Sequence, residues 1–374
     1  MSAGGIYIHF PFCVKRCLYC DFNVETPAKI PQRAYTDALL SELRTRASML
    51  RAPVRSVYVG GGTPSLWEPA MVGEVLAAIA HEVDVVGGAE VTLEANPSEI
   101  DSRWLAAIRH AGISRLSIGV QSLEDRLLTS LERRHDAGRA QRAIEMVSSG
   151  GFESYSLDFM FGLSGQDVIA WRGELERVLA LSPPHLSLYS LTVEPRTRLA
   201  RMIQSGKMQL PSDVIHADML FMARDVLTNH GFTHYEVSSY ARPGHRAVHN
   251  SGYWDMSPYL GLGAGAHGFI SPERWSNIRG VKAYIKAAMD DGIPTASREL
   301  LSPEIMTFER IMTGLRRLDV GVDVHDAWER YEPAIRGQER EGRLRVDGHR
   351  ICLTESGIRW MDSVLLALIS PKPG

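Results

Sequence analysis

Three cysteines, Cys13, Cys17 and Cys20, lie within eight residues in the segment HFPFCVKRCLYCDF. The fourth cysteine of the chain, Cys352, lies near the other end of the sequence. Three thiolates on one short loop can hold three irons of a four-iron, four-sulfur (4Fe-4S) cluster and leave the fourth iron without a protein ligand. That iron is free to chelate an amino acid through its amine and carboxylate, so the spacing predicts a cluster that takes up such a ligand.

Other sites fit this cysteine pattern less well. A structural zinc site needs four protein ligands, usually from paired Cys-x-x-Cys or Cys/His modules, and here one such pair is found, with His9 as a further candidate ligand. A disulfide framework is disfavoured because the 374 residues include only four cysteines. A thioredoxin-like motif has no need of a third cysteine. The cluster is therefore the favoured interpretation.

The methionine part of S-adenosylmethionine offers both the amine and the carboxylate that the open iron could bind. Binding there places the sulfonium beside a strongly reducing cluster. One-electron transfer could then break a carbon–sulfur bond and release a 5′-deoxyadenosyl radical. Tyr19, between Cys17 and Cys20, could cover the adenine.

Strand-like, β-branched runs alternate with segments of helical period, such as Ala34–Met49 and Gly138–Val147, through the first half of the chain. This alternation indicates parallel strands with right-handed crossovers. We therefore expect an α/β fold, a partial (β/α)6 barrel that is open rather than closed. Its six strands are expected at Gly5–Phe10, Ser56–Val59, Val91–Ala95, Leu116–Val120, Tyr155–Phe161 and Leu186–Val193.

The segment GGGTPS, residues 60–65, follows the second expected strand. Glycines at a strand end let the backbone approach a ligand closely, and this backbone could take the methionine amine. The same segment also fits a tight turn from strand to helix, with Pro64 starting the helix.

Polar residues also mark the later strands. Glu94 and Gln121 lie at the ends of the third and fourth expected strands, and Asp158 lies within the fifth; Arg133 lies farther along the chain. Individually, each could be a helix cap or a surface residue, although an acid such as Glu94 suits a cationic amine or ribose hydroxyls. Ligands of such folds bind at the carboxyl ends of the strands, so we expect these residues and the cysteine loop to meet at one rim.

The pattern changes beyond about residue 230. Residues 231–295 are rich in glycine and aromatic residues, and we expect ordered loop with little helix. They include the segment HNSGYW, which starts at His249. A histidine beside aromatic rings could be an axial heme ligand, or a packed histidine satisfied by a backbone carbonyl. His234, His245 and His267 are competing candidates.

From Ser302 onward we expect a mainly helical, winged-helix-like domain that closes over the barrel. Winged helices can bind DNA, but from Glu304 to the end twelve acids face eleven bases without a basic stripe, so a lid or a partner surface fits better. Its helices are expected at Ile305–Leu318, Val324–Tyr331 and Glu355–Leu368, with a hairpin that turns at Asp347-Gly348. The chain thus divides into residues 1–230, the barrel, 231–300, a linking segment, and 301–374, the C-terminal domain.

Composition narrows the class of protein further. The net charge of −3 and the pI near 6.5 argue against a broad basic surface for nucleic acid. The N-terminus lacks the basic start and apolar stretch of a signal peptide, and no apolar run is long enough to span a bilayer. We expect a cytoplasmic, reducing location, which suits free thiolates; peripheral membrane contact remains an open alternative.

The ordered motifs CVKRCLYC, GGGTPS, LEANP, IGVQS and DFMFGL resemble those of the radical S-adenosylmethionine superfamily. Over nearly its full length the chain resembles oxygen-independent coproporphyrinogen III oxidase and its relatives. The oxidases carry a fourth cysteine in the motif, at the position where this chain has Phe22. The segment HNSGYW instead matches the His-Asn-x-x-Tyr-Trp pattern of the HemW family of heme chaperones, which the chain resembles more.

This resemblance implies a protein that binds heme and passes it to hemoproteins such as respiratory cytochromes, with the cluster governing assembly or release. It implies Cys13, Cys17 and Cys20 as cluster ligands and His249 as the best match for a heme ligand. Positions that contact S-adenosylmethionine in the oxidase, some of them around a second cofactor molecule, match Tyr7, Gly61, Gly62, Thr63, Glu94, Gln121, Arg133 and Asp158.

The alternative is an enzyme that converts coproporphyrinogen III propionates to vinyls by radical oxidative decarboxylation. It would need an electron donor such as a flavodoxin or ferredoxin. A phenyl ring at Phe22 cannot ligate iron, yet the oxidase cluster also uses three cysteines, so Phe22 alone does not exclude radical chemistry. No catalytic side chain is assigned, and the sequence leaves open whether the protein is a monomer or a dimer.

Overall fold

The predicted open barrel is the central part of a larger sheet. The computed structural model describes residues 3–369, in which twelve strands form one sheet in the order β12-β11-β10-β9-β1-β2-β3-β4-β5-β6-β8-β7. The two end strands do not pair, so the sheet stays open, as the sequence predicted. Six neighbouring strands are parallel: β1 (Gly4–Phe10), β2 (Val54–Gly61), β3 (Val85–Ala95), β4 (Arg115–Gln121), β5 (Ser154–Phe161) and β6 (His185–Ser190).

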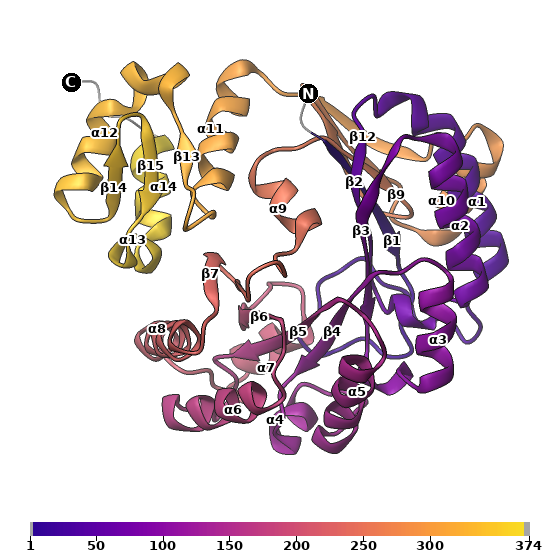
Figure 1. The fold of residues 1–374 in the computed structure, drawn as a ribbon, viewed down its shortest axis with the longest axis horizontal. Helices are drawn as coiled ribbons and strands as arrows, with labels where there is room; N and C mark the ends of the chain where they lie inside the picture. The colour runs from indigo at the N-terminus through magenta and orange to yellow at the C-terminus, as the bar shows by residue number, and fades with distance from the viewer. Residues whose placement is uncertain (1–2, 370–374) are drawn as a thin grey trace.

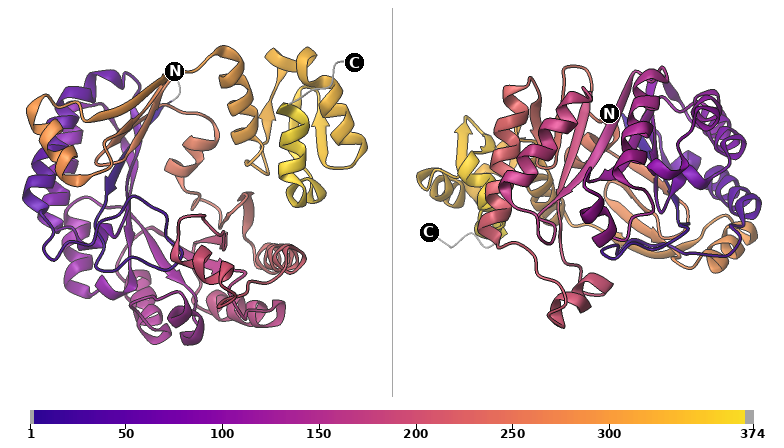
Figure 2. Two further views of the ribbon diagram at one scale, coloured as in Figure 1. Left: turned by 180° about the vertical axis from the view of Figure 1, so that it is seen from behind. Right: turned by 90° about the horizontal axis from the view of Figure 1, so that it is seen from below.

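Most helices of the barrel region cover the outer face of this curved sheet, and α9 (Val248–Trp254) lies on its concave side (Figures 1 and 2). Three of them begin where an aspartate side chain accepts a hydrogen bond from a first-turn N–H: Asp101 before α3, Asp136 before α5 and Asp167 before α6. The helices of this region are α1 (Gln32–Arg46), α2 (Pro69–Glu82), α3 (Ser102–His110), α4 (Asp125–Ser130), α5 (Ala137–Ser149), α6 (Val168–Ala180), α7 (Arg198–Gln204) and α8 (Asp213–Asn229).

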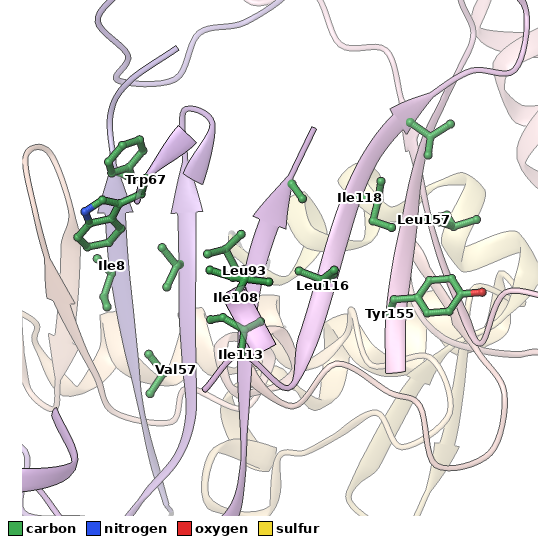
Figure 3. Packing of buried hydrophobic residues seen from close by; sticks show 14 of the residues in the cluster. Ile8, Val57, Trp67, Leu93, Ile108, Ile113, Leu116, Ile118, Tyr155 and Leu157 are labelled. Carbon is green, nitrogen blue, oxygen red and sulfur yellow. The ribbon is translucent and has the colours of Figure 1, made fainter. Parts of the chain in front are cut away.

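Alternation along each strand separates the apolar core from the polar interior. Ile8, Val57, Leu93, Leu116 and Leu157 come from five successive strands and lie side by side under the helices (Figure 3). Because successive strand residues point to opposite faces, their neighbours along the chain face the barrel interior. Many of these neighbours are polar or aromatic: Tyr7, His9, Tyr58, Glu94, Ser117, Ser156 and Asp158. On β6, Ser187 and Tyr189 flank the buried Leu188 in the same way.

The segment 231–300 contains more regular structure than expected. Ordered loop was predicted, but the segment extends both edges of the sheet, because its short glycine- and aromatic-rich strands pair with β1 and β6. In these short strands polar and apolar residues show little alternation, so the sequence did not predict them. The elements are β7 (Thr233–Glu236), β8 (Ser239–Ala241), α9 (Val248–Trp254), β9 (Tyr259–Leu262), β10 (His267–Ile270), β11 (Glu273–Asn277), α10 (Val281–Asp290) and β12 (Thr295–Leu300).

The C-terminal domain has its own apolar core and a small three-stranded sheet. Its elements are α11 (Pro303–Gly314), β13 (Val322–Asp323), the 3-10 turn η4 (His325–Ala327), α12 (Trp328–Arg340), β14 (Leu344–Asp347), β15 (Arg350–Leu353), α13 (Glu355–Arg359) and α14 (Met361–Ile369). The predicted hairpin is present, but Asp347 pairs with Arg350, so the turn consists of Gly348 and His349 rather than Asp347 and Gly348.

Two predicted helices of this domain also differ. The helix expected at Val324–Tyr331 starts later, at Trp328, because a 3-10 turn comes first, and it runs on to Arg340. The final helix is interrupted at Trp360. The C-terminal domain was predicted to close over the barrel, and it contacts the sheet near both ends of its strand order instead. Glu309 on α11 pairs with Arg274 on β11. Arg317, after α11, pairs with Glu236 on β7.

Candidate functional site

The cysteine loop leaves β1 at the carboxyl end of the sheet. Its base is held by backbone hydrogen bonds from Cys13 N to Glu25 O (2.9 Å) and from Glu25 N to Pro11 O (2.7 Å). The three thiols of Cys13, Cys17 and Cys20 are free and half-buried. They line one cavity of about 370 Å³ together with residues from the ends of the parallel strands.

Two donors point at the sulfur atoms. Thr63 Oγ1 lies 3.4 Å from Cys13 Sγ, and Arg133 Nη1 lies 3.5 Å from Cys17 Sγ. Burial raises the pKa of Cys13 to about 11 and raises that of Cys20, so these thiols hold protons until a metal replaces them. Hydrogen bonds and a cation beside sulfur stabilise the negative charge that a bound iron–sulfur group carries.

The arrangement fits a cluster better than a single ion. In residues 3–369, no three histidine, cysteine or acidic side chains converge on one metal position. The three thiols line one cavity, and Arg133, whose Nη1 lies beside Cys17, has its Nε buried without a hydrogen-bond partner. Three soft sulfur ligands around a cavity of this size are the donor set that an iron–sulfur cluster takes.

Glu94 also lines the cavity. Its carboxylate accepts hydrogen bonds from Tyr58 Oη (2.8 Å) and from Gly61 N (3.0 Å). Burial raises the pKa of Glu94 to about 7, although both hydrogen bonds lower it. An acid in this position can pair with a cationic ligand inside the cavity.

The glycine turn has a packing role as well as a place in the cavity. Gly61 has φ of 116°, and a Cβ there would meet the His9 ring at 2.6 Å; a Cβ on Gly62 would meet Phe12 O at 2.6 Å. The glycines thus let the second strand end pass against the start of the cysteine loop. Gly61, Gly62 and Thr63 all line the cavity, and a ligand role for their backbone stays a prediction.

Gln121, Arg133 and Asp158 reach the same cavity from β4, from the loop after α4 and from β5. Gln121 has φ of 69°, a conformation that costs a non-glycine residue free energy and is often found at functional sites. Asp158 accepts hydrogen bonds from Ser117 Oγ (2.7 Å) and Ser156 Oγ (2.9 Å), and burial raises its pKa.

The two predicted tyrosines differ in position. Tyr19 lines the cavity beside Arg133, and burial raises its pKa to about 12. Tyr7 is not among the lining residues; it faces the barrel interior lower on β1, where its hydroxyl lies 2.9 Å from His9 Nδ1 and its ring stacks on Tyr58.

Sequence reasoning missed several cavity residues, including Tyr58, Ser117 and Tyr189. The signal that could have found them is the period of two: in SIGVQ, SLDFM and HLSLYS, polar residues alternate with buried aliphatic ones. In a parallel strand buried on both sides, a polar residue at that period points into the site.

His249 lies apart from the cysteines. It is on α9, within the hollow of the curved sheet (Figure 1), and does not line the cavity. Its ring is buried, with Nδ1 3.0 Å from Ser56 Oγ and Nε2 2.9 Å from Tyr253 Oη. Burial, then the charge of Arg55, lowers the pKa of His249 to about 3, so the ring is neutral. His267, by contrast, is exposed on β10.

One residue connects these two regions. Tyr58 donates its hydroxyl hydrogen bond to Glu94 in the cavity, and its ring stacks on His249 with centroids 5.2 Å apart. Phe22 also lines the cavity and is 61% exposed, so its ring does not pack into the core.

Comparison with known proteins identifies the families and relatives that this chain resembles. The family model of the radical SAM superfamily matches residues 7–175, and that of the HemN C-terminal domain matches residues 301–360. A protein named heme chaperone HemW from Mycobacterium tuberculosis is 35% identical over 98% of this chain and 94% of its own length. The radical S-adenosyl methionine domain-containing protein 1, mitochondrial, of Bos taurus is 36% identical over 98% of this chain and 87% of its own.

The fold also matches a solved structure. Coproporphyrinogen III oxidase (HemN) from Escherichia coli, described as a radical SAM enzyme, superposes with a TM-score of 0.83 over 99% of this chain and 91% of the oxidase. The two sequences are 22% identical, so this likeness concerns the fold. Within residues 3–369, no helix is long and apolar enough to cross a membrane.

Proposed function

Because this chain belongs to the HemW family within the radical SAM superfamily, we propose that it is a heme chaperone, which binds heme and transfers it to acceptor hemoproteins. The observation that carries the proposal is identity of 34–35% to proteins named heme chaperone HemW from several organisms, over most of both chains. The oxidase shares the fold at only 22% identity.

The cavity supports the cofactors of the radical SAM superfamily. Cys13, Cys17 and Cys20 are the residues that would hold a 4Fe-4S cluster, with Thr63 and Arg133 beside the sulfurs. When bound, the cluster supplies an open iron that can chelate the amine and carboxylate of S-adenosylmethionine. Glu94 would attract the cationic cofactor. Hydrogen bonds from Tyr58 Oη and Gly61 N hold the Glu94 carboxylate in position.

Heme needs a separate place, because a cavity of about 370 Å³ has room for one drug-sized ligand. We assign its iron to His249, whose ring is neutral and therefore has one lone pair for a metal. Both ring nitrogens already have partners, so ligation requires α9 to move and one of those hydrogen bonds to break. His267 is the exposed alternative.

Heme titration tests this proposal. The cluster is reconstituted anaerobically, heme is added, and the Soret band gives the stoichiometry; an apo-hemoprotein such as a respiratory cytochrome then serves as acceptor. We expect one heme per chain, lost in His249→Ala and kept in His267→Ala, followed by transfer to the acceptor. Absence of stoichiometric heme binding would contradict the proposal, and a loss confined to His267→Ala would move the ligand there.

A further inference from the structure

The C-terminal domain carries a pair of histidines outside the site described above. His325 lies in η4, directly after β13, and His349 lies in the turn between β14 and β15. Both side chains are exposed, and their Nδ1 atoms are 3.1 Å apart. We propose that this pair is a binding site for a divalent transition-metal ion such as Zn²⁺, held by the two Nδ1 atoms.

The backbone fixes the two rings relative to one another. Val324 N donates a hydrogen bond to His349 O (2.9 Å). In addition, β13, which precedes η4, pairs with β15, which follows the turn, through Asp323 and Arg350. His325 N donates to Asp323 Oδ1 (2.9 Å), which holds the start of the 3-10 turn. Two loops distant in sequence therefore present their imidazoles as a preorganised pair.

Aromatic packing limits the rotation of the rings. The two imidazoles meet edge to face with centroids 4.6 Å apart, and Trp328 packs in the same manner on His349 at 5.0 Å. The Arg336 guanidinium covers the Trp328 ring. Ring positions fixed by packing reduce the entropy that a bound ion would otherwise have to offset.

The separation of the nitrogens suits a metal. With metal–nitrogen bonds of about 2.0–2.1 Å, two nitrogens 3.1 Å apart subtend an angle of about 100° at the ion, which is close to tetrahedral. Two imidazole ligands select zinc, nickel or copper over magnesium or calcium. No third histidine, cysteine or acidic ligand converges there among residues 3–369, so water completes the coordination.

The test uses the full-length protein with its cluster in place, so that the three cysteines are occupied. The protein is dialysed against Zn²⁺ without oxygen, and zinc bound per chain is measured for the wild type, His325→Ala, His349→Ala and the control His110→Ala, an exposed histidine on α3. We expect one zinc per wild-type chain and a loss of affinity of at least about tenfold in either pair variant, with the control unchanged.

X-ray absorption at the zinc edge of the wild-type protein supplies a second readout, independent of any variant. Two imidazole nitrogens at about 2.0–2.1 Å with oxygen ligands are expected. No zinc uptake by the wild type, or equal uptake by the double variant H325A/H349A, would overturn the proposal and leave the contact a hydrogen bond between two rings. The result is independent of heme binding, so the two proposals can fail separately.

Discussion

The functional side chains that line the cavity are of two kinds, the cysteine thiols and the charged or hydrogen-bonding groups near them. In the proposed function the thiols would provide the metal ligands; Thr63 and Arg133 place donors beside two of them, and Glu94 provides a buried acid in the same cavity. The ionisation of Glu94 is the property most open to experiment, because its pKa of about 7 lies within the working range of the protein.

Glu94 predicts a pH-dependent affinity for S-adenosylmethionine. The pKa is raised, so the carboxylate is mostly protonated at pH 6 and mostly charged at pH 8. A cationic ligand binds more tightly when Glu94 is charged. The affinity should therefore rise with pH, by up to about tenfold per pH unit below the pKa of Glu94, and level off above it. Calorimetric titrations at pH 6, 7 and 8 measure it. Glu94→Gln should bind weakly at all three, while the exposed Glu176→Gln should keep the wild-type slope.

Tyr58→Phe removes the hydroxyl that donates to Glu94 and keeps the ring that stacks on His249. Loss of one hydrogen bond of about 1 kcal/mol should weaken S-adenosylmethionine binding roughly fivefold at pH 7, and the pKa of Glu94 should rise. The matched control is Tyr253→Phe. This variant loses the hydroxyl that contacts His249 and leaves the hydrogen bond from Tyr58 to Glu94 in place. Equal cofactor affinity of the two variants would contradict this role for Tyr58.

At the scale of elements, the sequence indicated the six parallel strands and the rim where their polar residues meet. Those features follow from local alternation and from the direction of parallel strands. The position of α9 depends on contacts distant in sequence: Glu90 on β3 accepts hydrogen bonds from Val248 N and His249 N. No local pattern reveals such pairing, so the separation of His249 from the cysteines could not be predicted.

The proposed ligation of heme by His249 includes a movement of α9 that breaks one of the hydrogen bonds of the ring. Ser56→Ala removes the partner of His249 Nδ1, so heme uptake should accelerate roughly fivefold, the equivalent of about 1 kcal/mol. Stopped-flow absorbance at the Soret band follows the rate, with the exposed Ser205→Ala as control. If Ser56→Ala matches the wild type while His249→Ala still loses heme, release of α9 does not limit uptake.

Across the whole molecule, the main apolar core of the barrel and that of the C-terminal domain are joined by largely polar contacts. Ion pairs connect Arg246 with Asp319 and Arg224 with Glu355, and the Arg316 guanidinium lies over Trp254 of α9, with its carbon 5.5 Å from the ring centroid. Polar interfaces of this kind permit one part to open while the other stays folded. The C-terminal domain thus contacts α9 directly without lining the cluster cavity.

Separate cores predict separate stabilities. Ile335→Ala removes a fully buried side chain of the C-terminal core and should cost that domain about 2–5 kcal/mol. Hydrogen exchange should then show faster opening of α12 and β15, with cluster absorbance unchanged. Leu157→Ala in the barrel core should instead reduce cluster retention. Loss of the cluster in Ile335→Ala would show that the two cores unfold together.

The heme-chaperone function is tested most directly by offering the protein heme and coproporphyrinogen III under the same conditions. Reconstituted protein receives S-adenosylmethionine, a reductant and either heme or coproporphyrinogen III, and the products are separated by chromatography. A heme chaperone should bind heme stoichiometrically and transfer it to an apo-acceptor, with no decarboxylated porphyrinogen. Formation of protoporphyrinogen together with 5′-deoxyadenosine would contradict this function and would identify the chain as an oxidase.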